Sequence, residues 1–383
     1  MVASLMALNA LAIDIMLPAL GTIAGDLGVA SANDRQLVVV AYVLGFGLPQ
    51  LVWGPLSDRF GRRSVLLCSL VGYTLMGLLA AGVSTFEQLL ALRMAQGVFA
   101  AGARVVAVAV VRDIHSGREM ASIMSWIMTV FMAVPIIAPM LGQLVLYLAP
   151  WRWLFVLLGA AGLLMLLWTA LRLDETGEPQ ARGPLLRSAM DGYRALLRSR
   201  VSVGYTLAGG VIFAALFAYL AAAEQIFAEV FDAADTFVFW FALIAAALAA
   251  ANIANARLVR RFGMRRLSHG ALLGFTVLSA LLLALSAYFG ESLALFIPLF
   301  SALFALFGLI GSNFNALAME PFRETAGTAS AAYGFITTTA SGVIGGWLAR
   351  GYDGSSLPLI AGYVALGLTG LVIVVITERG RLF

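Results

Sequence analysis

The chain has 383 residues, of which 62% are hydrophobic and 11% are charged, and its net charge is +4. A soluble domain carries roughly 25% charged residues, so this composition excludes a soluble globular protein. All 24 basic residues are arginine, which excludes a phosphate-binding loop built on lysine. The arginines are scattered over short loops, unlike the clustered basic face of a nucleic-acid-binding protein.

Twelve apolar runs follow one another along the chain. Each is continuous rather than alternating and close to the length of about 20 residues that a membrane-spanning helix needs. The runs cover roughly residues 3–21, 37–57, 64–83, 88–111, 120–148, 153–172, 202–228, 236–256, 267–288, 292–318, 326–348 and 357–377. The sequence therefore predicts an all-α polytopic membrane protein with twelve transmembrane helices.

The arginines predict the orientation of these spans. If both termini are cytoplasmic, 19 arginines lie in inner loops and only Arg35, Arg152 and Arg350 lie in outer loops. Because cytoplasmic loops carry an excess of basic residues, we expect both termini to be cytoplasmic.

The longest polar stretch, residues 173–200, separates six spans from six. It predicts a cytoplasmic linker between an N-terminal half, residues 1–172, and a C-terminal half, residues 201–383. Within it, Pro184 to Arg198 is interpreted either as a short amphipathic helix on the membrane surface or as a solvated tether.

An internal repeat supports the two halves. The segment from Gly54 to Arg63 has a degraded copy from Ala256 to Arg265, at a constant offset of 202 residues. A fixed offset of about half the chain is typical of the duplication of a six-helix unit.

The first copy of this repeat, after the second span, resembles the signature of the major facilitator superfamily. Its glycines permit a tight turn and a close approach of helices. Its acid and arginines predict a charge network that holds the two halves together and gates transport without contacting substrate. The motif consists of Gly54, Asp58, Arg59, Gly61, Arg62 and Arg63.

Five further segments combine polar, proline or glycine residues with the apolar runs: Asp14-Ile-Met-Leu-Pro18-Ala19; Arg93-Met-Ala-Gln96-Gly97, followed by Arg112-Asp113; Pro135-Ile-Ile-Ala-Pro139-Met-Leu-Gly142; Trp151-Arg152-Trp-Leu-Phe155; and Asn313-x-Asn315 with Ala326 to Ala331. These segments resemble the Bcr/CflA group of drug:proton antiporters within that superfamily, with Met16 where the family usually has tyrosine. The resemblance implies the major facilitator fold, a bacterial inner-membrane location and proton-coupled export by a monomer.

Four charged residues lie well inside predicted spans, where a charge costs several kcal/mol: Asp14, Arg93, Arg104 and Glu224. Asp14 and Arg93 lie about 10 Å and about 9 Å from the outer ends of their helices, so they could face each other. Such a pair could bind a proton or a cationic substrate, or form a fixed salt bridge. The resemblance implies that Asp14 couples protons to substrate. For Arg104, where the family usually has a small residue, we expect a structural role.

Glu224 shares one helix face with Phe213, Phe217, Leu220, Phe227 and Phe231. This aromatic stripe is interpreted either as a lipid-facing or helix-facing surface or as the outer wall of a substrate cavity, with Phe217 and Glu224 as candidate contacts.

Other polar and kinking residues add candidates. Asn252, Asn255, Asn313 and Asn315 either line a cavity, with Asn313 as a candidate substrate contact, or join helices by hydrogen bonds. Pro135 and Pro139 each remove a helix hydrogen bond, which predicts a kink in the fifth span where it faces the other half. The kink is interpreted either as part of the gate or as a bend without a gating role.

The leading functional hypothesis is a proton-coupled secondary transporter that exports small, largely apolar drug-like compounds by alternating access. An exporter of a sugar or amino-acid metabolite is the alternative, and a receptor, channel-like protein or membrane enzyme is less favoured. We expect small-molecule, proton and lipid-bilayer partners, and no metal, cofactor, nucleic-acid partner or enzymatic activity.

Overall fold

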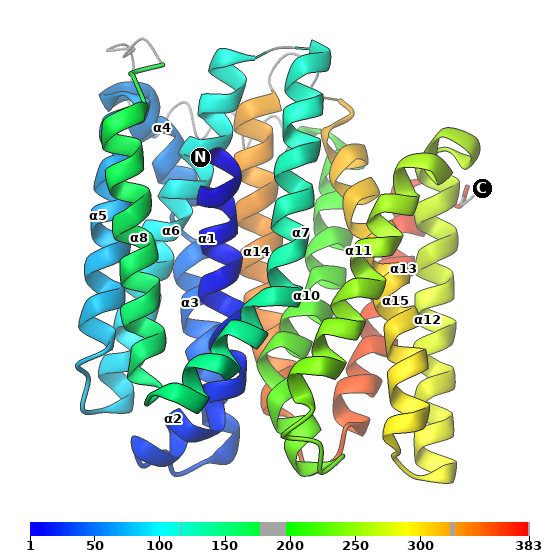
Figure 1. The fold of residues 1–383 in the computed structure, drawn as a ribbon. Helices are drawn as coiled ribbons and strands as arrows, with labels where there is room; N and C mark the ends of the chain where they lie inside the picture. The colour runs from blue at the N-terminus through cyan, green and yellow to red at the C-terminus, as the bar shows by residue number, and fades with distance from the viewer. Residues whose placement is uncertain (116, 177–196, 322–325, 382–383) are drawn as a thin grey trace. The chain divides into compact units, whose positions relative to one another are not determined.

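A computed structural model describes residues 1–115, 117–176, 197–321 and 326–381, and every regular element in these ranges is helical. The elements are α1 (Val2–Asp14), η1 (Leu17–Ala19), α2 (Leu20–Asp26), η2 (Ala32–Gln36), α3 (Leu37–Gly47), α4 (Gln50–Phe60), α5 (Arg62–Ala80), α6 (Phe86–Ile114), α7 (Gly117–Leu148), α8 (Arg152–Arg172), α10 (Arg200–Glu229), α11 (Phe237–Phe262), α12 (Met264–Phe289), α13 (Leu293–Met319), α14 (Ala326–Arg350) and α15 (Leu357–Thr377) (Figure 1).

The predicted spans coincide with these helices. Within the described ranges, nine helical segments are long and apolar enough to cross a membrane, and the pair α3 and α4, bent by 44°, makes a tenth. The two remaining runs coincide with α7 and α14. The all-α membrane architecture predicted from the apolar runs is therefore confirmed.

Proline explains where the first two spans are interrupted. Pro18 follows α1 and lies in η1, and Pro49 separates α3 from α4. Proline lacks the N–H that a helix needs, and its ring clashes with the carbonyl four residues earlier. For Pro18 that residue is Asp14, so the first span breaks directly after its acidic residue.

The helices group into two compact units. The first comprises Met1–Arg194 with Gly327–Phe335, and the second comprises Ala195–Ala326 with Ile336–Phe383. The division of the chain at residues 173–200 stays a prediction. Residues 177–196, which include most of the predicted surface helix, lie outside the described residues.

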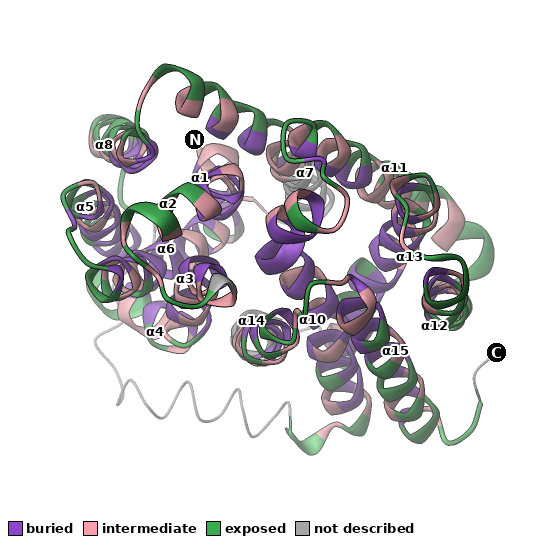
Figure 2. Cartoon of the chain, turned by 90° about the horizontal axis from the view of Figure 1, so that it is seen from below, coloured by how far each residue is buried: buried purple, intermediate pink, exposed green. Residues whose placement is uncertain are grey.

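In the first unit α6 is the central helix, packed against α1, α3, α4 and α5, while α5 also packs against α8. Figure 2 shows α5 and α8 with exposed faces outward and buried faces toward their neighbours. At the crossing of α3 and α6, a side chain on Gly45 or Gly97 would collide with the backbone of the other helix. These glycines let the two helices approach closely.

In the second unit α10 packs against α13 and α15, and α12 packs against α13 and α15. The core of this unit is aromatic: Tyr219 contacts Phe241, Phe300 and Phe304. Large apolar side chains are exposed on the outer surfaces of both units, such as Leu171 (80%) and Phe289 (74%). Such exposure suits a protein whose solvent is the hydrocarbon of a bilayer.

Candidate functional site

Asp14 is the last residue of α1 and lies at the break in the first span. Its side chain is buried, with an exposed fraction of 3%. Among the described residues, none forms an ion pair or a hydrogen bond with its carboxylate. Because an isolated charge is costly to bury, this carboxylate is a functional candidate rather than a structural one.

Arg93 occupies the interior of α6 and is fully buried. Its guanidinium donates hydrogen bonds to the Ala12 carbonyl (2.8 Å), the Gln96 side chain (2.8 Å) and the Val38 carbonyl (3.4 Å). It also lies over the Tyr42 ring, 4.4 Å from the ring centroid. Arg93 therefore joins α6 to α1 and α3 through backbone acceptors and a cation–π contact.

Asp14 and Arg93 do not form the ion pair that their predicted depths allowed. Arg93 reaches the carbonyl of Ala12, two residues before Asp14, and its remaining donors are directed to Gln96 and Val38. The structure brings the two residues to neighbouring positions on adjacent helices. It leaves the carboxylate without a fixed cation, which differs from the salt-bridge interpretation.

The sequence reasoning missed two polar residues beside this position. Tyr42 donates a hydrogen bond of 2.8 Å to the Asn9 side chain, and both residues are buried. Asn9 lies five residues before Asp14 in an otherwise apolar run. A search for every polar residue inside the spans, rather than every charged one, would have found it.

The signature motif builds a charge network at the junction of α4 and α5. Arg62 is bonded to Asp58 (2.5 Å), to Asp113 at the end of α6 (2.8 Å) and to the Ser57 hydroxyl (2.6 Å). The guanidinium of Arg63 donates to the Ala170 carbonyl of α8 at 2.8 Å. The network thus joins α4, α5, α6 and α8 within the first unit.

The glycines and the remaining arginine of the motif have distinct positions. Gly61 adopts φ +89° and ψ 149° between α4 and α5, a conformation that suits glycine. Gly54 faces α6, and a Cβ added to it would lie 3.9 Å from the Val105 side chain. Arg59 lies over the Phe60 ring at 5.5 Å and is exposed. The role of the motif in gating stays a prediction.

Glu175, which follows α8, completes this network and was not anticipated from the sequence. Its carboxylate accepts hydrogen bonds from the backbone N–H of Arg62 (2.6 Å) and of Arg63 (3.2 Å). It therefore caps the first turn of α5, where free N–H groups and the helix dipole favour a negative charge.

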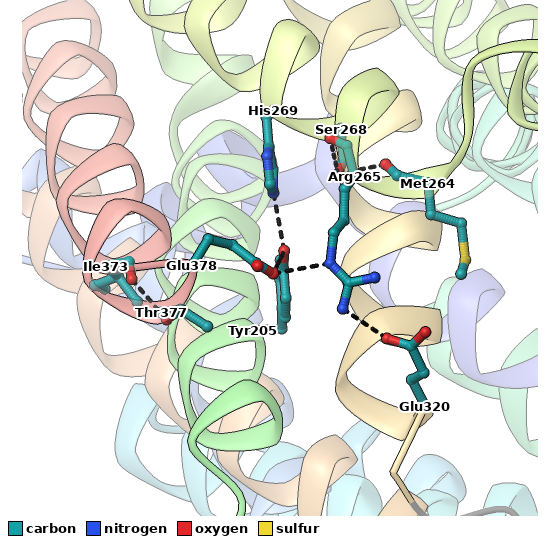
Figure 3. A network of polar contacts seen from close by, with 9 residues as sticks. All are labelled: Tyr205, Met264, Arg265, Ser268, His269, Glu320, Ile373, Thr377 and Glu378. Atoms are coloured by element: carbon teal, nitrogen blue, oxygen red, sulfur yellow. Dashed lines mark hydrogen bonds and ion pairs between the residues drawn. The ribbon is translucent and has the colours of Figure 1, made fainter. Parts of the chain in front are cut away.

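The second unit has a corresponding network at the start of α12 (Figure 3). Arg265 binds Glu378 at 2.9 Å and Glu320 at 2.7 Å. Tyr205 of α10 donates to Glu378 at 2.6 Å, and a ring nitrogen of His269 lies 2.9 Å from the Tyr205 hydroxyl. Burial raises the pKa of Glu378, whereas the hydrogen bonds from Tyr205 and Arg265 lower it. The lowering is the larger effect, so the pKa of Glu378 lies below its usual value.

The segment from Pro135 to Gly142, which resembles the Bcr/CflA group, lies on α7. Pro135 and Pro139 are inside this helix, and Figure 1 shows its second half leaning away from its first. At Gly142 an added Cβ would collide with the Ile15 carbonyl and would lie 3.0 Å from Pro18. The segment therefore packs directly against the break that follows Asp14, and its part in gating stays a prediction.

The aromatic stripe on α10 does not form one open wall. Phe213 packs against Phe307, and Phe227 is fully buried against Phe237 and Phe296. Phe217 lies beside Gly345 of α14. These contacts within the second unit favour the helix-packing interpretation of the stripe. Glu224 is partly buried, and its substrate contact stays a prediction.

Asn313 joins two helices. It is buried, and its amide donates to the Asn255 side chain of α11 and to the Leu309 carbonyl, both at 2.7 Å. The Asn255 amide in turn donates to the Ser312 hydroxyl at 3.2 Å. The structure thus gives Asn313 the interhelical role that the sequence left open beside substrate binding.

Comparison with known proteins identifies the family. The model of the Major Facilitator Superfamily matches residues 2–346. The chain belongs to this superfamily. It is therefore a multi-pass membrane transporter of small molecules.

Two relatives match this superfamily member over most of their length. An uncharacterized MFS-type transporter, YdgK, from Bacillus subtilis is 31% identical over 88% of this chain and 84% of the relative. A bicyclomycin resistance protein homolog from Haemophilus influenzae is 28% identical over 91% of this chain and 87% of the relative. The second relative agrees with the resemblance of this sequence to the Bcr/CflA group.

A solved D-xylose-proton symporter has the same fold. The superposition of the two structures has a TM-score of 0.77 and covers 97% of this chain and 95% of the symporter, and the two sequences are 17% identical. At this identity the likeness establishes the major facilitator fold, which the motifs predicted.

Proposed function

We propose that this transporter exports small, largely apolar drug-like compounds in exchange for protons, by alternating access across a bacterial inner membrane. Both termini are cytoplasmic, the halves comprise residues 1–172 and 201–383, and a monomer carries out transport. The excess of arginine in the inner loops supports the orientation, and the names of relatives such as the bicyclomycin resistance protein homolog support the substrate class.

The buried, unpaired carboxylate of Asp14 is the observation that carries the proton coupling. No cation among the described residues holds it in the charged form, so a proton can bind and leave as access changes. The adjacent 3-10 segment η1 and the close contact of Gly142 place the carboxylate at a discontinuity of the first span. Discontinuous helices near the midplane are typical of the coupling sites of secondary transporters.

The network around Arg62 is assigned to gating. It fixes the relative positions of four helices in the first unit and uses charged side chains at the helix ends. Breaking and remaking such contacts changes the balance between inward-open and outward-open states. Arg93, which fastens α6 to the Ala12 backbone, positions the helix that carries Asp14.

Transport driven by an imposed pH gradient tests the proposal. Protein reconstituted in liposomes is expected to move bicyclomycin when the gradient is applied and to stop when it is collapsed by an ionophore. Asp14→Asn, which keeps the shape and removes the titratable group, is expected to lower the driven rate at least tenfold.

The matched control is Glu87→Gln, the same chemical change at an exposed acid in the first turn of α6. This variant is expected to transport like the unmodified protein. Full gradient-driven transport by Asp14→Asn would refute the assignment of the proton site. Gradient-driven movement of xylose or of amino acids instead of bicyclomycin would favour the metabolite exporter.

A further inference from the structure

Helix α6 carries two arginines on one face. Arg93 and Arg104 are eleven residues apart, which is about three helical turns and about 16 Å along the axis. Each guanidinium lies over an aromatic ring of α3: Arg93 over Tyr42 at 4.4 Å and Arg104 over Phe46 at 5.5 Å. The two rings are themselves stacked, with centroids 6.4 Å apart. The two arginines therefore have matching aromatic surroundings.

The two arginines differ in their hydrogen bonds. Arg93 is fully buried and donates to three acceptors of the chain. Arg104 is partly exposed, and no described residue accepts a hydrogen bond from it or forms an ion pair with it. Besides Phe46, its described neighbour is Tyr333, which belongs to the same unit and interacts with it electrostatically.

The sequence predicted a structural role for Arg104, and its contact with the Phe46 ring of α3 is compatible with such a role. Arg104 lacks, however, the hydrogen bonds to described residues that hold Arg93 in place. Arginine presents five N–H donors, and an ionisable residue inside a membrane span marks a functional site by default. The donors of Arg104 are thus available to an acceptor that is not part of the described chain.

The position of Arg104 limits what that acceptor can be. It lies ten residues before the end of α6 at Ile114, or about 15 Å along the helix axis. A lipid phosphate at the membrane surface would not reach this depth. A transported molecule, which crosses the full thickness of the membrane, would.

We propose that Arg104 recognises a carboxylate on an aromatic substrate. A guanidinium fork matches the two oxygens of a carboxylate. The buried side chains of Phe46 and Tyr333 make the surroundings of Arg104 aromatic, and such surroundings favour an aromatic body next to the carboxylate. This inference rests on the proposed export function and adds a substrate class to it: aromatic acids bind better than uncharged compounds of the same shape.

Equilibrium binding of two isosteric probes tests the proposal without any pH gradient. Isothermal titration of the protein in lipid nanodiscs compares 1-naphthoate with 1-naphthamide, which share a ring system and differ in charge. The unmodified protein is expected to bind 1-naphthoate at least tenfold more tightly. Arg104→Met, which removes the donors without adding a polar group to the span, is expected to bind the two probes within twofold of each other.

Two further variants secure the interpretation. Arg104→Gln is expected to lose the preference in the same way, and it replaces Arg104→Met if that variant does not fold. Arg266→Gln, at an exposed arginine near the start of α12, is expected to keep the tenfold preference.

Equal binding of the two probes by the unmodified protein, or a preference kept by the Arg104 variants, would overturn the proposal. Since these are binding measurements, they are independent of the Asp14 transport assay. Loss of gradient-driven transport with an intact 1-naphthoate preference would refute the coupling mechanism alone.

Discussion

The two charge networks occupy the same place in the two units but are built differently. Each begins at a glycine with positive φ: Gly61 at φ +89° and ψ 149°, and Gly263 at φ +78° and ψ 159°. Each also uses an acid close after the last helix of the repeat: Glu175 is three residues after the end of α8, and Glu378 is one residue after the end of α15. The backbone turn and the position of this acid are thus common to both copies.

The arginine at the centre of each network lies at a different position after the glycine turn in the two copies. In the first unit it is Arg62, one residue after the glycine, and its side chain is 9% exposed. In the second it is Arg265, two residues after the glycine, and its side chain is 40% exposed. The place of Asp58 is taken by Arg260. Duplication therefore preserves the geometry of the turn, while the charges around it diverge and leave the first network more buried.

Alanine at the two glycines should give the largest effects. Both conformations are accessible almost only to glycine, so each substitution costs about 1–3 kcal/mol in strain. At Gly61 the new Cβ would also collide with the Glu175 carboxylate, whereas nothing lies within 4 Å at Gly263. We expect Gly61→Ala to lower the melting temperature more than Gly263→Ala in detergent. An equal or larger loss at Gly263 would contradict the comparison.

Replacement of Arg62 or Arg265 by glutamine should give the next largest difference in stability between the two networks. Arg62→Gln leaves Asp113, with a side chain 18% exposed, without its cation, which should cost about 2 kcal/mol because the pair is largely buried. Arg265→Gln should cost less than about 1 kcal/mol, since its ion pairs are more exposed. Chemical denaturation of both variants measures the two values. Similar losses would show that burial does not distinguish the networks.

The difference between Asp58 and Arg260 is expected to appear in turnover. Asp58→Asn removes a partner of Arg62 and should slow transport about tenfold, or about 1.4 kcal/mol, while substrate affinity stays unchanged. Arg260→Gln, at the corresponding position of the second unit, should leave turnover within twofold. Transport and binding assays on both variants provide the check, and a loss of affinity in Asp58→Asn would place the motif at the substrate site instead.

The smallest effect concerns the acid stability of the second network. The pKa of Glu378 is lower in the folded protein than its usual value of 4.5, so its ionised form stabilises the fold above that pH. The contribution is lost as the pH falls through the folded pKa. Glu378→Gln should therefore reduce the fall in melting temperature between pH 6 and pH 3, whereas Glu87→Gln should not. If Glu378→Gln shows the same fall in melting temperature between pH 6 and pH 3 as the unmodified protein, ionisation of Glu378 does not stabilise the fold.

The sequence by itself determined the class of protein and most of its helices. Apolar runs of about 20 residues are a local property of the chain, and a bilayer admits only helices or closed barrels. The motif from Gly54 to Arg63 likewise predicted a turn and a charge network, because glycine spacing and charge are readable directly. The breaks at Pro18 and Pro49 also have a local cause, but they were not predicted from the sequence.

Only the tertiary structure decided which side chains meet. The depths of Asp14 and Arg93 were readable from the sequence, but the rotation of each helix about its axis was not. The sequence therefore left a fixed salt bridge open as an alternative, and the structure shows no ion pair between the two side chains. Glu175 lies 113 residues from Arg62, and no local pattern joins them. The contrast between Arg93 and Arg104, two arginines on one helix face, also depends on packing. The length and position of an apolar run fix where a helix lies in the membrane, whereas the partners of a side chain are fixed by the contacts that neighbouring helices offer.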